Sequence, residues 1–135
     1  MKNLETVTEE IQRAFDVDSI PARRTMTSEE IRNLARLCSQ AFDSKVHEGV
    51  IERIIRYINH MERHMKGRAA GHIEDLVLRY LVRYFSSLSA TGAPEESHLE
   101  IGVLFGATTI LTHHAVRLAG KDISQVVIDP FAGFY

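Results

Sequence analysis

Residues 72–88 read HIEDLVLRYLVRYFSSL, and this stretch decides the predicted fold. Its apolar residues recur at intervals of three and four, which is the spacing of one side of an α-helix. They are Ile73, Leu76, Val77, Tyr80, Leu81, Tyr84, Phe85 and Leu88. Leu78 and Val82 widen this apolar side, so only a narrow polar stripe remains. A helix over residues 72–89 with so little polar surface is expected at the centre of a helical core.

Two further long helices are predicted on either side of this one. Residues 44–66 carry an apolar seam with steps of three and four, which favours packing along a neighbouring helix. The seam consists of Ile51, Ile54, Ile58, Met61 and Met65. Residues 95–119 follow Pro94 and begin with two glutamates, which favour a helix start, and the segment ends before Gly120. We expect this third helix to be apolar almost all round.

Two shorter helices are predicted nearer the N-terminus. One covers about residues 5–15, and the other begins after Thr27, where Glu30 completes a capping box. The sequence thus predicts an all-α fold, a compact bundle of about five helices in one domain. Residues 1–26 are expected to include a mobile N-terminal arm. Residues 122–135 form an aromatic C-terminal tail, expected as a short helix or an extended segment.

Composition excludes several classes of protein. The chain has 135 residues, of which 44% are apolar and 25% charged, so intrinsic disorder is excluded. Its one cysteine, Cys38, excludes a disulfide framework and a thiolate zinc cluster. A net charge of −2 provides no general attraction to nucleic acid or to membranes. The most apolar stretch, residues 101–112, is shorter than the ~20 residues of a membrane span. We therefore expect a cytoplasmic protein without a signal peptide.

An apolar surface beyond the needs of one core is the main functional prediction. Gly102 and Gly106 define a stripe of small residues, and aromatic residues end the chain. We expect a small regulatory or adaptor protein that forms a homodimer and occludes or organises a protein partner. The expected partner-binding residues are Leu81, Phe85, Ile101, Gly102, Phe105, Gly106, Phe131, Phe134 and Tyr135. No nucleophile elbow, phosphate loop or paired-cysteine motif occurs, so neither an enzyme nor a cofactor is expected.

Two histidine pairs give an alternative, a bundle that binds a metal or a small ligand. His60 and His64 are four residues apart and share one side of a helix, as two ligands of one metal ion would. His113 and His114 lie in an apolar segment and are candidate ligand-binding or pH-sensitive groups. For both pairs, structural or solvated histidines are the commoner interpretation.

A second alternative is nucleic-acid binding through the basic helix 44–66. Residues 45–83 contain more basic than acidic side chains, and a basic patch is expected on this helix and its following turn. The patch consists of Arg53, Arg56, Arg63, Lys66 and Arg68. Acidic residues interleave with it, and the turn before the helix lacks a glycine, so a DNA-reading helix is disfavoured.

Overall fold

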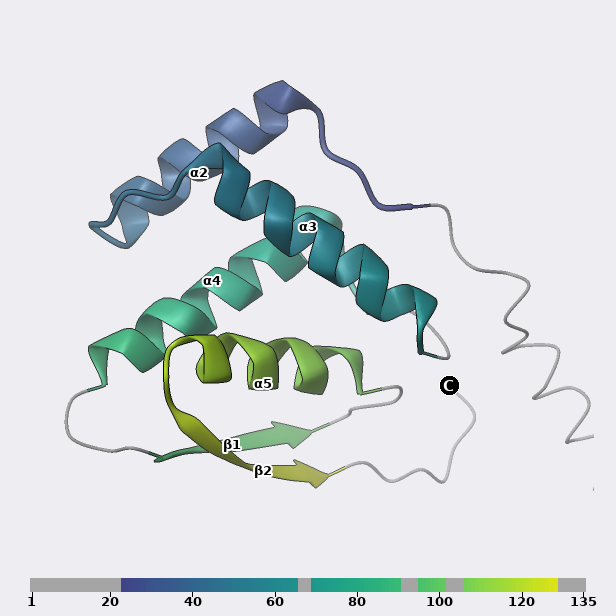
Figure 1. Cartoon of the computed structure of the whole chain (residues 1–135), viewed down its shortest axis with the longest axis vertical. Coiled ribbons are helices and arrows are strands. Elements are labelled where there is room, and N and C mark those ends of the chain that lie inside the picture. The colour runs from purple at the N-terminus through teal and green to yellow at the C-terminus, as the bar shows by residue number, and fades with distance from the viewer. Residues whose placement is uncertain (1–22, 66–68, 91–94, 102–105, 129–135) are drawn as a thin grey trace, which may run out of the picture.

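The computed structural model describes residues 23–65, 69–90, 95–101 and 106–128. In these residues the elements are four helices and two strands (Figure 1). The helices are α2 (Ser28–Ala41), α3 (Glu48–Arg63), α4 (Ile73–Ser89) and α5 (Ala107–Leu118), and the strands are β1 (Glu95–Ile101) and β2 (Asp122–Ile128). The helix predicted over residues 5–15 lies outside the described residues.

Helix α2 begins where its sequence predicts. Thr27 is the N-cap, its side chain accepts from the backbone N–H of Glu30, and the Glu30 carboxylate accepts from the backbone N–H of Thr27. The capping box is therefore confirmed. The buried face consists of Ile31, Ala35 and Cys38, so Cys38 is a core residue.

Helix α3 begins later than predicted, at Glu48 instead of residue 44. The Ser39 hydroxyl accepts from the backbone N–H of Val46 and donates to the carbonyl oxygen of Ala35. Val46 is itself buried, so this segment is held against the end of α2 in a non-helical conformation. Helix α4, by contrast, matches the predicted range closely and supplies the buried Leu76, Val77 and Leu81.

The all-α prediction is wrong, because the predicted helix over residues 95–119 is a strand followed by a shorter helix. Residues 95–101 form β1, and α5 begins only at Ala107. Gly106 has a φ of 74°, a left-handed conformation that glycine adopts readily and that ends any continuous helix. Leu99 and Ile101 flank Glu100 with the alternation of a strand, a period that competes with the helical reading of a short segment. The structure is therefore not a compact five-helix bundle.

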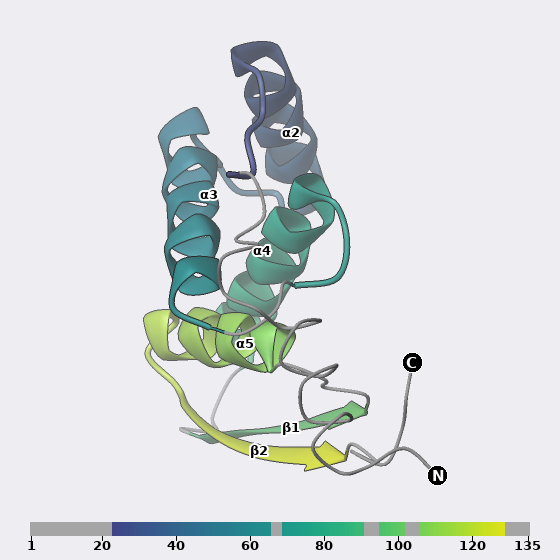
Figure 2. The same cartoon turned by 90° about the vertical axis from the view of Figure 1, so that its right-hand side faces the viewer.

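The second strand lies in the predicted C-terminal tail, which is extended over residues 122–128. β1 and β2 pair in parallel, with Leu99 beside Val126 and Ile101 beside Ile128. Helix α5 connects the two strands and lies between the sheet and the other helices (Figure 2). Thr108 and Thr109 on α5 donate to the Glu100 carboxylate, which fastens β1 to this helix.

A buried ion pair fixes the segment before α2. Arg24 lies against α3, and its guanidinium donates to both oxygens of the Glu62 carboxylate at 3.0–3.2 Å. It also donates to the carbonyl oxygens of Ala69 and Gly71. Asn59 holds the Arg24 backbone, accepting from its N–H and donating to its carbonyl oxygen. Residues 23–26 of the predicted arm are thus attached to the core, and residues 1–22 lie outside the described residues.

Candidate functional site

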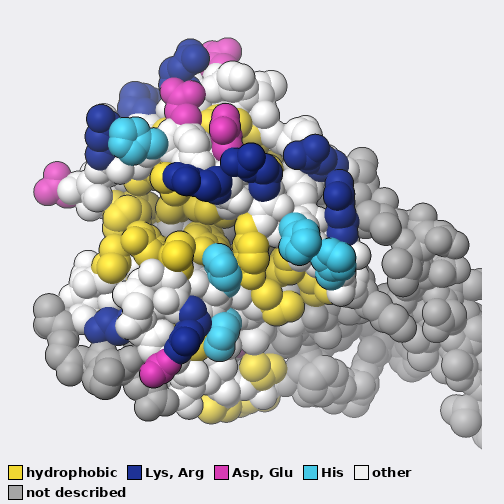
Figure 3. All heavy atoms as spheres, in the orientation of Figure 1, with side chains coloured by type: hydrophobic (Ala, Val, Ile, Leu, Met, Phe, Trp, Pro, Cys, Tyr) yellow, Lys and Arg dark blue, Asp and Glu magenta, His cyan; other side chains and the backbone are white. Residues whose placement is uncertain are grey.

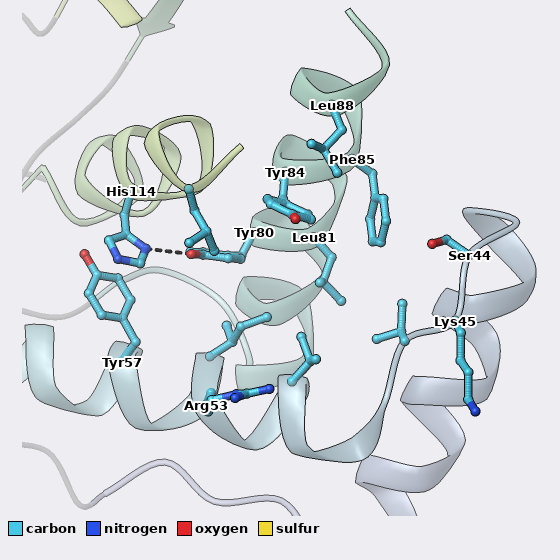
Figure 4. A pocket seen from close by; sticks show the side chains of 14 residues that line it. Ser44, Lys45, Arg53, Tyr57, Tyr80, Leu81, Tyr84, Phe85, Leu88 and His114 are labelled. Carbon is cyan, nitrogen blue, oxygen red and sulfur yellow. Dashed lines mark hydrogen bonds between the residues drawn. The ribbon is translucent and has the colours of Figure 1, made fainter. Parts of the chain in front are cut away.

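A pocket of about 610 Å³ lies between α3, α4 and α5 (Figure 4). This volume is in the range of small-molecule sites, which extends from ~300 to ~1,000 Å³. The lining residues are Ser44, Lys45, Val46, Val50, Arg53, Ile54, Tyr57, Tyr80, Leu81, Tyr84, Phe85, Leu88, His114 and Leu118. Most of them are aliphatic or aromatic, so the pocket is suited to an apolar molecule.

Helix periodicity explains why these walls are apolar. α4 presents lining residues at positions 80, 81, 84, 85 and 88, the three-four spacing of one helix face. Phe85 stacks on Phe42 from the end of α2, with ring centroids 4.6 Å apart, and meets Tyr84 edge to face. These aromatic contacts hold the side of the pocket near α2 in place.

His114, Tyr80 and Tyr57 form a polar group in this apolar wall. The Tyr80 hydroxyl is 2.6 Å from Nδ1 of His114, and the imidazole stacks on the Tyr57 ring with centroids 4.0 Å apart. Each residue comes from a different helix, so the group joins α3, α4 and α5 at one end of the pocket (Figure 4). The Tyr80–His114 contact thus joins α4 to α5, and the Tyr57 ring of α3 packs against it.

Burial keeps this group neutral. It lowers the pKa of the His114 imidazole below its ordinary value, and the neighbouring His113 adds a smaller effect. Burial also raises the pKa of Tyr80 to about 12, with Tyr57 and Tyr84 contributing. At neutral pH we assign Tyr80 as the donor to Nδ1, because a phenol is the better acid, which leaves the imidazole proton on Nε2. The wall then offers donors and acceptors without a charge.

Lys45 and Arg53 are the charged residues that line the pocket, and both are exposed. In Figure 3, apolar side chains gather in a hollow between α3 and α5, and Lys and Arg side chains lie along its α3 edge. Arg53 is one helical turn from Tyr57 on the same side of α3. The pocket therefore combines an apolar interior with a basic margin.

The residues predicted to bind a partner are distributed over separate places. Leu81 and Phe85 line the pocket, Leu81 being buried and Phe85 half-buried. Ile101 is at the end of β1 and is 73% exposed, and Gly106 is the N-cap of α5. The remaining predicted positions lie outside the described residues: Gly102, Phe105, Phe131, Phe134 and Tyr135.

The four candidate histidines also lie in different places. His60 and His64 are exposed at the end of α3 with ring centroids 4.5 Å apart, and His113 is exposed on α5. Within the described residues, no group of three His, Cys, Asp or Glu side chains is placed to hold a metal ion. Of these four histidines, His114 is the one that lines the pocket described above.

The basic patch lies on the outer side of α3. Arg53, Arg56 and Arg63 are exposed there, whereas Lys66 and Arg68 lie outside the described residues. Nucleic-acid binding through this helix stays a prediction. The sequence places Arg53 in this patch but does not indicate its position at the pocket. The sequence places Tyr80 on an apolar helix side and does not single out Tyr57, although a tyrosine on an apolar helix face signals a buried polar partner.

Comparisons of the chain with protein-family models, with curated proteins and with solved structures found no match. No helix in the described residues has the length and apolar composition of a membrane span. The pocket between α3, α4 and α5 therefore provides the basis for a functional proposal.

Proposed function

We propose that this protein binds a small apolar molecule in the pocket between α3, α4 and α5. The observation that carries the proposal is the concave, mostly apolar lining that surrounds one neutral polar group, Tyr80 with His114. Binding sites for small molecules have this composition, because apolar walls supply affinity and a few polar groups fix orientation. A role in sequestering or sensing such a molecule follows. It develops the small-ligand alternative, with His114 as the participating histidine.

A neutral fluorescent probe, N-phenyl-1-naphthylamine, tests this proposal. We expect saturable binding with one probe per chain. Leu88→Glu places a carboxylate on the pocket wall at a half-exposed position, so it should weaken probe binding about tenfold with little effect on folding. The matched control is Leu37→Glu on α2, a half-exposed leucine away from this pocket. Equal probe affinity in both variants would refute the pocket as the site.

Association of two copies is a second candidate function, supported by the outer face of the sheet. Leu99, Ile101, Val126 and Ile128 all project from this face and are more than half exposed. Because neighbours in register point to the same side, they form one apolar patch, with Ser97 and Ser124 next along the strands. We propose that a second copy of the chain covers it, since an uncharged patch meets its two-fold copy without like-charge repulsion. Ile101, one of the residues predicted from the sequence to bind a partner, belongs to this patch.

Sedimentation velocity at micromolar concentration tests the dimer. The unchanged chain should sediment as a dimer, Val126→Lys as a monomer, and Leu37→Lys on α2 as a dimer. A monomer in all three samples would eliminate this candidate and leave the pocket proposal untouched. We also propose a cytoplasmic location, which the buried free thiol of Cys38 supports.

A further inference from the structure

The charge at the pocket margin has one sign. Among the lining residues two are basic, Lys45 and Arg53, and none is a carboxylic acid. In the described part of the chain, the nearby acidic Glu48 pairs with Arg32 on α2, away from this margin. Arg53 is not part of any ion pair between described residues. A negatively charged group arriving at this margin would therefore meet two lining cations and no lining carboxylate.

The two cations have different positions relative to the apolar interior. Figure 4 shows Arg53 on the α3 wall, below the rings of Tyr80 and Tyr57, whereas Lys45 extends away from the pocket. Arg53 thus lies close to the apolar walls. A ligand whose apolar body fills the pocket would place one end beside the guanidinium.

We propose that the ligand of this pocket is an amphipathic monocarboxylate, with an aliphatic or aromatic body in the apolar interior and its carboxylate on Arg53. This inference rests on the proposed function of the pocket. A guanidinium matches a carboxylate with two parallel hydrogen bonds, which makes the pair geometrically selective. A cationic ligand is disfavoured by both lining cations. A polyphosphate is disfavoured because one nearby guanidinium in an apolar wall supplies too few donors for several charges.

Three molecules with the same ten-carbon chain test the head group: decanoate, decanol and decylamine. Each is measured by displacement of N-phenyl-1-naphthylamine at fixed ionic strength, because salt screens exposed charges. We expect decanoate to bind about tenfold more tightly than decanol, as a charge-assisted hydrogen bond would give, and decylamine to bind most weakly.

Arg53→Gln should abolish the preference for decanoate over decanol. Arg56→Gln is the matched control, because Arg56 is also exposed on α3 but does not line this pocket. This control should keep the tenfold preference. An equal loss in both variants would show a general attraction to the basic helix and would overturn the proposal.

The remaining outcomes separate this inference from the proposed function. If the neutral probe and decanol bind but decanoate binds no more tightly, the carboxylate assignment is wrong and the apolar pocket stands. If decylamine binds most tightly, the assigned charge is wrong. If neither the probe nor any ten-carbon molecule binds, both proposals fail.

Discussion

Replacing Arg24 by methionine should strongly destabilise the fold, because Arg24 connects three separate segments. Its guanidinium donates to the Glu62 carboxylate of α3 and to the carbonyl oxygens of Ala69 and Gly71. Both side chains of the Arg24–Glu62 pair are 6% exposed, so water cannot replace the lost donors. Methionine keeps most of the apolar stem and removes the charge. The Glu62 carboxylate then stays buried and loses these donors, while the Ala69 N–H still donates to it at 2.9 Å.

Breaking a buried ion pair by removing one partner costs about 3–5 kcal/mol, and we expect Arg24→Met to lie in this range. Urea unfolding followed by far-ultraviolet circular dichroism measures the loss, provided that the slope with urea stays constant. The adjacent Arg23 is exposed, so Arg23→Met should change the free energy of unfolding by less than about 0.5 kcal/mol.

A double variant tests the reason for the loss. Arg24→Met with Glu62→Met removes both charges, and it should be more stable than Arg24→Met alone, because no under-solvated carboxylate remains. A loss below about 1 kcal/mol for Arg24→Met would refute the reasoning. So would a double variant that is less stable than the single one.

Further predictions concern His114 and two glycines. Burial lowers the pKa of His114, so as the pH falls below 6.5 this imidazole takes up a proton in the unfolded chain before it does so in the folded one. The free energy of unfolding therefore decreases in this pH range. His114→Gln should flatten this part of the stability–pH curve. If the His114→Gln variant loses stability with falling pH as steeply as the unchanged chain does, the lowered pKa of His114 is contradicted. Gly106→Ala should cost about 1 kcal/mol in thermal unfolding because of its left-handed φ. Gly49→Ala, in α3 with open space around the added methyl group, should instead stabilise by about 0.5–1 kcal/mol.

The helices were predictable because their signals are local. The capping box at Thr27 and the apolar periodicity of α4 involve residues within a few positions of one another. The strand β1 was not predictable, because its seven residues follow Pro94 and begin with two glutamates, a pattern that also suits a helix start. Its partner β2 begins only after α5, so the pairing that stabilises β1 leaves no local trace in the sequence.

The site was predictable only in part for the same reason. His114 was recognisable as a polar residue in an apolar helix, but its contact with Tyr80 spans 34 positions of the chain. Arg24 lies in the predicted N-terminal arm, and nothing near it in the sequence indicates the Glu62 carboxylate that it contacts. Long-range polar contacts of this kind depend on how the helices pack, which periodicity does not specify.

Chemical-shift mapping with decanoate tests the central claim most directly. Isotope-labelled protein is titrated with decanoate, and the shifts of backbone and aromatic side-chain resonances are followed. We predict that saturable shifts cluster at pocket residues, above all Arg53, Tyr57, Tyr80 and His114, and leave His60 and the outer face of the sheet unchanged. Shifts confined to Leu99 and Val126, or the absence of saturable shifts at the pocket, would contradict it.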